Sequence, residues 1–128
     1  MAFWSRRRPT DGPAAQPEIA ASDWSSVTTP EQVRDLVRQG VLEPMLLLPA
    51  AYGGKEQPMN VVHVPRGLVA LREQTVLGTV NQMIGDGVAD SYTTDVEYRG
   101  DSQIPAALHI HATGSGSTGG FHPTLTIW

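Results

Sequence analysis

The feature that most constrains the fold is a regular alternation of apolar and polar residues in the last third of the 128-residue chain. The segments SYTTDVEY, AALHIHAT and FHPTLTIW each alternate in this way, which is the pattern of a β-strand with one buried face. The turn-forming runs RGDSQIP and GSGSTGG separate them. Three sequential strands joined by short connections predict an antiparallel meander.

Two helices are predicted upstream of this meander. In TTPEQVRDLVRQG, Thr29 suits the N-cap, Pro30 the first helical position and Gly40 the C-terminal stop. A second, longer helix is expected over about residues 70–85, before the sequence GDG. Its apolar residues at helical spacing are Leu71, Val76, Leu77, Val80, Met83 and Ile84.

The segments VLEPMLLLPA and NVVHV have the composition of strands, although prolines interrupt or end them. Together these patterns predict an α+β fold, in which two helices pack on one face of an antiparallel or mixed sheet of about five strands. We expect residues 26–128 to form this single domain. Residues 1–25 have no sustained periodicity and are predicted to be a flexible N-terminal arm.

Three of the four histidines lie close together in the meander. Because Leu108 and Ile110 are expected to face the core, His109 and His111 should point to the opposite side of the sheet. A His-x-His pair on a strand is one way in which divalent metal sites recruit two ligands. The same pair also occurs on half-exposed sheet surfaces without any metal. The candidate metal ligands are therefore His109, His111, His122 and, if its strand is adjacent, His63, with Asp95 or Glu97 nearby.

Composition limits the function classes. The formal charge of −4 lacks the basic excess of a general nucleic-acid binder, and Arg6, Arg7 and Arg8 alone are a short basic run, read as a solvated tail or as a contact for an anionic surface or partner. The absence of cysteine excludes disulfides and thiolate metal sites. The longest apolar run, MLLLPAA, is too short to cross a membrane. We expect a cytoplasmic protein that binds neither membranes nor nucleic acid.

No catalytic constellation or cofactor motif stands out in the sequence. The predicted function is therefore a non-catalytic binding or protein-interaction module that associates with itself, as a homodimer, or with an unknown protein partner. Aromatic residues on the terminal strands favour this hypothesis, because such residues are enriched at interfaces: Tyr92, Tyr98, Phe121 and Trp128. The alternative is a metal-dependent enzyme that uses the His-x-His pair and a metal-bound water as nucleophile.

Overall fold

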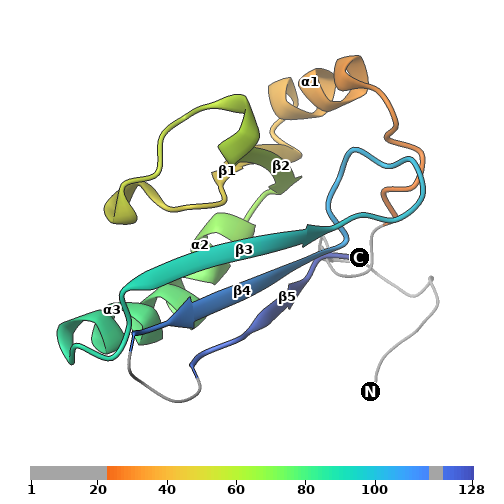
Figure 1. The fold of residues 1–128 in the computed structure, drawn as a ribbon. Helices are drawn as coiled ribbons and strands as arrows, with labels where there is room; N and C mark the ends of the chain where they lie inside the picture. Colours follow the sequence, from red (N-terminus) through yellow and green to blue (C-terminus); the bar gives the residue numbers. More distant parts are fainter. Residues whose placement is uncertain (1–22, 116–119) are drawn as a thin grey trace.

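A computed structural model describes residues 23–115 and 120–128 (Figure 1). The fold is α+β, and its strands form two antiparallel sheets. The smaller sheet pairs β1 (Leu42–Leu46) with β2 (Val61–Pro65). The larger one has the order β3 (Ser91–Glu97), β4 (Ala107–Thr113) and β5 (Thr124–Thr126). Short 3-10 turns at Ala50–Tyr52 and Pro58–Asn60 lie in the loop that joins β1 to β2.

The predicted fold class and the C-terminal three-strand meander are confirmed, but the five strands do not form one sheet in the described part of the chain. Pro44 in β1 and Pro65 in β2 lack the N–H donors that a longer ladder requires. Where the two sheets approach, the side chain of Thr94 in β3 donates to the carbonyl oxygen of Leu47 at 3.4 Å. A side-chain contact, and no backbone ladder of the described residues, thus joins the two sheets.

The first helix, α1 (Pro30–Arg38), is built as its sequence predicts. The hydroxyl of Thr29 accepts the N–H of Gln32, and the side chain of Gln32 accepts the N–H of Thr29. This reciprocal capping box satisfies two donors that the helix start leaves unpaired. Gly40 ends the segment with a φ of 78°, which glycine adopts without strain. The helix buries Val33, and it packs against β1.

The second helix is continuous over three segments, α2 (Leu68–Arg72), the π-helical η4 (Glu73–Leu77) and α3 (Gly78–Gly85). A carboxylate oxygen of Glu43 accepts the N–H groups of Gly67 and Val69 and so caps its first turn. The helix agrees with the predicted range of about 70–85, and it lies behind the three-stranded sheet in Figure 1.

The face that this helix buries differs from the predicted one at both ends. Leu71 and Ile84, expected in the apolar face, are each 44% exposed, whereas Arg72 is only 4% exposed. Val76, Leu77 and Val80 are buried as predicted. The π turn at Glu73–Leu77 rotates the residues after it relative to an ideal α-helix. The residues that face the core before and after this turn therefore do not follow one regular helical spacing.

The core runs along the inner face of the large sheet. Leu108 and Ile127 pack with residues of the small sheet, while Ile110 packs with Val76 and Val80 of the second helix. The described part of the chain begins at Asp23. Trp24, which the sequence places in the arm, is buried, and its carbonyl accepts the Ser102 hydroxyl at 2.7 Å. Residues 1–22 of the predicted arm lie outside the described residues.

Candidate functional site

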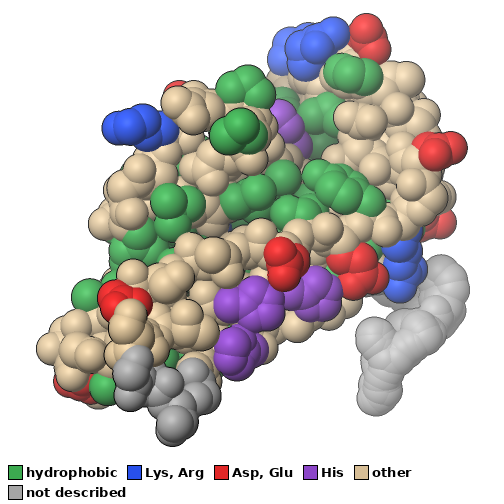
Figure 2. Space-filling view, viewed as in Figure 1, with side chains coloured by type: hydrophobic (Ala, Val, Ile, Leu, Met, Phe, Trp, Pro, Cys, Tyr) green, Lys and Arg blue, Asp and Glu red, His purple; other side chains and the backbone are tan. Residues whose placement is uncertain are grey.

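Polar and ionisable side chains gather on one exposed face of the three-stranded sheet, opposite the second helix (Figure 2). We call this surface the outer face, and its members are Thr93, Asp95, Glu97, His109, His111, His122 and Thr124. Strand alternation produces it, because Leu108 and Ile110 are fully buried on the other side of β4. The predicted orientation of the imidazoles is confirmed.

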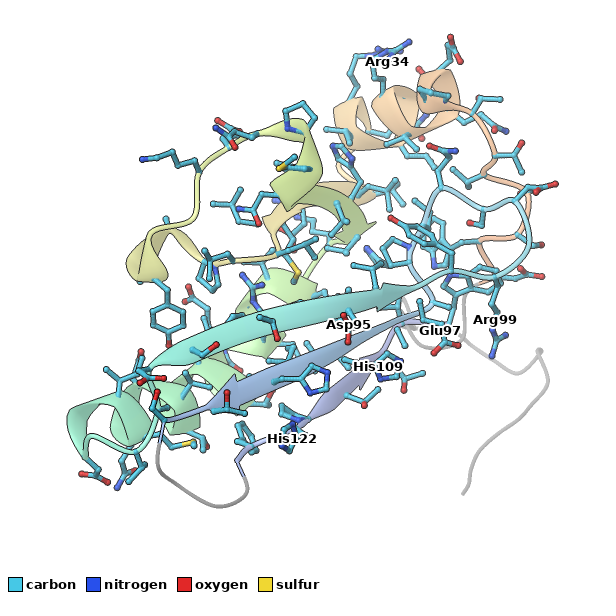
Figure 3. The ribbon with its side chains drawn as sticks, in the orientation of Figure 1. Arg34, Asp95, Glu97, Arg99, His109 and His122 are labelled. Atoms are coloured by element: carbon cyan, nitrogen blue, oxygen red, sulfur yellow. The ribbon has the colours of Figure 1, made fainter. Side chains whose placement is uncertain are left out.

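One chain of contacts on the outer face joins Glu97, His109 and Thr124, one residue from each strand (Figure 3). The Nε2 atom of His109 lies 2.8 Å from a carboxylate oxygen of Glu97, and its Nδ1 atom lies 3.1 Å from the Thr124 hydroxyl. An ionised carboxylate can only accept, so Nε2 carries the proton and donates. Nδ1 of a neutral imidazole then accepts from the hydroxyl.

A second chain joins Asp95, His111 and His122. The Nε2 atom of His111 lies 3.2 Å from a carboxylate oxygen of Asp95, and the Nδ1 atoms of the two histidines are 2.9 Å apart. With Nε2 of His111 donating to Asp95, the neutral pair is held by the Nδ1–H of His122. The contact between the rings therefore requires that one of the two facing Nδ1 atoms donates and the other accepts.

The chain of Glu97, His109 and Thr124 resembles the acid, imidazole and hydroxyl order of nucleophilic catalysis only in its connectivity. The side chains of His109 and Glu97 are 38% and 55% exposed, so that water competes for each contact. Exposed pairs of this kind are typically worth about 0–1 kcal/mol. The arrangement is that of a hydrogen-bonded surface patch.

The structure brings three of the four candidate metal ligands together. His63 is not among them, because its strand β2 pairs only with β1 in the described chain. Over the described ranges, no group of three or more histidines and acids is placed to hold a metal ion. Metal binding by His109, His111 and His122 stays a prediction.

A cluster of polar groups lies between the two sheets and was not predicted from the sequence. Arg72 is nearly fully buried, and the buried hydroxyl of Tyr92 lies within reach of the Arg72 and Thr94 side chains but forms no well-aligned hydrogen bond with a described residue. The rings of Tyr92 and Tyr52 contact each other with centroids 5.3 Å apart. Burial raises the pKa of both phenols, and the nearby Arg72 opposes that shift. The sequence signal for this cluster was Arg72, a single arginine among the apolar positions of the second helix.

The outer edge of β3 is a second surface that the sequence anticipates only in general terms. Strand β3 pairs with β4 on one side, and no described strand pairs with its other side. Its inward residues Tyr92, Thr94 and Val96 are half-buried. In Figure 2 a band of hydrophobic side chains lies between the hairpin and this edge. We call it the apolar band, and it includes Leu47, Tyr52, Tyr92 and Val96.

In comparisons with known proteins, no protein-family model, no curated protein and no solved structure matches this chain. None of the helices in residues 23–115 and 120–128 has the length and apolarity to span a membrane. The functional argument therefore depends on the surfaces described above.

Proposed function

We propose that the protein is a non-catalytic interaction module that forms a homodimer by pairing the β3 edges of two copies. The observation that carries this proposal is the edge of a seven-residue strand with which no strand of the described residues pairs. Natural edge strands are commonly protected by charged side chains, especially lysine, by proline, by a bulge or by a very short length. The sequence SYTTDVE carries two acids but neither lysine nor proline, and its pairing register with β4 is unbroken.

The chemistry of β3 supports a second copy as the occupant. Antiparallel pairing about a two-fold axis at Thr94 would place each Tyr92 opposite the other copy's Val96, and the two Thr94 residues opposite each other. Aromatic with β-branched and threonine with threonine are favourable cross-strand pairs. A two-fold axis also closes the assembly at two copies.

The charges of β3 are compatible with this register. Asp95 would lie opposite the other copy's Thr93, and Glu97 opposite its Ser91, so that no two acids face each other directly. Within each copy, Asp95 and Glu97 already contact His111 and His109. Each acid thus already accepts a hydrogen bond from an imidazole of its own copy.

The apolar band is a partly exposed surface that the β3 strand of a second copy would bury. Tyr92 and Val96 are only partly covered in one copy, and they lie on the same side of β3 as the hairpin. The inward side chains of a second β3 would extend this apolar surface and remove it from water. Edge hydrogen bonds and apolar burial would therefore act together.

Paired charge substitutions at Thr93 test the register. Thr93→Asp places an acid opposite Asp95 of the other copy, and Thr93→Lys places a cation there. Each contact occurs twice in the dimer and is worth about 0.2–1 kcal/mol. The dimer dissociation constant should therefore rise about 2- to 30-fold for Thr93→Asp and fall about 2- to 30-fold for Thr93→Lys. Sedimentation equilibrium at micromolar concentrations would measure both dissociation constants.

The matched control is the same pair of substitutions at Thr126, an exposed residue on the opposite edge strand β5. Neither Thr126→Asp nor Thr126→Lys should change the dissociation constant. A monomeric protein at all concentrations, or equal effects at both edges, would contradict the proposal. Loss of the dimer on deleting residues 1–22 would assign association to that segment instead.

The proposed setting is the cytoplasm. A chain without cysteine suits a reducing compartment, in which structural disulfides rarely form. An unrelated protein that adds a strand to the same edge is the alternative partner. Such a partner would compete with self-association, and its binding would be the same for the Thr126 variants as for the wild-type protein.

A further inference from the structure

The guanidinium of Arg72 is a buried cation without an anion. The residue is 4% exposed, and its hydrogen bonds within the described chain go to backbone carbonyls, from Nη1 to Leu46 at 2.7 Å and to Leu47 at 3.5 Å. The ion pairs of the described residues involve other side chains. A buried charge that is neither paired nor fully hydrogen-bonded is strongly unfavourable.

The unpaired part of this side chain has a definite geometry. Nη1 is held by the end of β1, while Nε is buried and has no partner in the described residues. Nε and Nη2 form the side edge of the guanidinium, with two parallel N–H bonds. That edge is the one that binds both oxygens of a carboxylate.

A second buried donor lies beside it. The hydroxyl of Tyr92 lies within hydrogen-bonding reach of the Arg72 and Thr94 side chains, yet it forms no well-aligned hydrogen bond with a described residue. The rings of Tyr92 and Tyr52 contact each other next to these donors. Val76 and Leu77, from the same helix as Arg72, are buried nearby in the core that includes both rings. The cluster thus combines unused donors with apolar walls.

We propose that Arg72 and Tyr92 form a binding site for a small organic monocarboxylate. The side edge of the guanidinium donates to the two carboxylate oxygens, and the Tyr92 hydroxyl donates a third hydrogen bond. The apolar part of the ligand lies against the tyrosine rings, at the apolar band between the hairpin and β3. The donors of this site belong to one copy, whereas the apolar band beside them is also the surface that the proposed dimer would cover.

Charge and donor number favour a carboxylate over a phosphate. One guanidinium balances the single charge of a carboxylate, whereas a phosphate dianion would keep an uncompensated charge in a buried site. Lys55 is exposed and lies outside the cluster. The two donors of the side edge and one hydroxyl also match two oxygens better than the four of a phosphate.

Thermal unfolding and isothermal titration calorimetry of the full chain test this site with acetate, benzoate, inorganic phosphate and chloride at equal ionic strength. A ligand that binds the folded state raises the melting temperature with increasing concentration. Benzoate should bind more tightly than acetate because its ring contacts the tyrosines. Tyr92→Phe should weaken benzoate binding about tenfold or more, as expected for one lost hydrogen bond to a charged group.

Tyr98→Phe is the matched control, because it removes a phenol that is 48% exposed and lies outside the cluster. It should leave benzoate binding unchanged. Arg72→Met should abolish binding, and if this variant does not fold, Tyr92→Phe still decides the question. The proposal is overturned if carboxylates have no effect, if chloride or phosphate acts equally well, or if Tyr92→Phe binds benzoate as the wild-type protein does.

Discussion

The two faces of β4 differ in almost every physical respect, although their residues alternate along one strand. On the inner face, Leu108 and Ile110 have no exposed surface and contact the core. On the outer face, His109 and His111 keep more than a third of their surface and contact acids of β3. The inner face therefore determines stability, and the outer face is available to vary in charge.

The same comparison explains why the two proposals involve β3 and its surroundings. Strand β3 lies where the inner and outer faces meet an edge that no strand in residues 23–115 and 120–128 pairs with. The inward Tyr92 is partly covered, because the hairpin sheet stops short of β3 and contacts it through Thr94. Because the two sheets do not join, the edge of β3 can pair with another strand, and the donors of Arg72 and Tyr92 can bind an anion.

Truncation on each face gives the largest expected difference. Ile110→Ala should lower the free energy of unfolding by about 2–5 kcal/mol, because it removes a fully buried side chain and leaves a cavity. His111→Ala, one residue away, should cost no more than about 1 kcal/mol. Urea denaturation of both variants measures the two values. Equal decreases in the free energy of unfolding for the two variants would contradict the difference between the inner and outer faces.

Alkaline unfolding should show an intermediate effect, centred on Tyr92. Burial raises the pKa of its phenol in the folded state above the ordinary value of 10.0. The unfolded chain therefore ionises first, and the stabilisation is complete below pH about 10 and is lost as the pH rises through the folded pKa. Stability measured against pH should fall less steeply for Tyr92→Phe than for the wild-type protein.

Tyr98→Phe serves as the comparison for that experiment. Burial also raises the pKa of Tyr98, but its side chain is about half exposed, so its contribution should be smaller. An identical pH dependence for Tyr92→Phe and the wild-type protein would show that the phenol is not desolvated in the folded state.

The smallest effect is expected for the contact between Glu97 and His109. A double-mutant cycle with Glu97→Gln and His109→Gln should give a coupling free energy below about 1 kcal/mol, because both side chains are substantially exposed. The coupling should decrease further in high salt. A larger value that resists salt would mean that the outer face is shielded from water, for example by a partner.

Much of the local structure was predictable because its causes are short-range. The cap at Thr29, the stop at Gly40 and the alternation of β4 each depend on a few neighbouring residues. The burial of Arg72 was not predictable, since it depends on the π turn that follows it and on carbonyls more than twenty residues away. The separation of His63 from the other histidines likewise required the strand order.

The sequence by itself determined the helix and strand types and the side of the meander to which the imidazoles point, because side-chain alternation and capping act within a few residues. Only the tertiary structure decided that the strands divide into two sheets and that His111 faces His122. It also placed Arg72 beside Tyr92. These pairings depend on register and packing between distant segments, which no local pattern encodes.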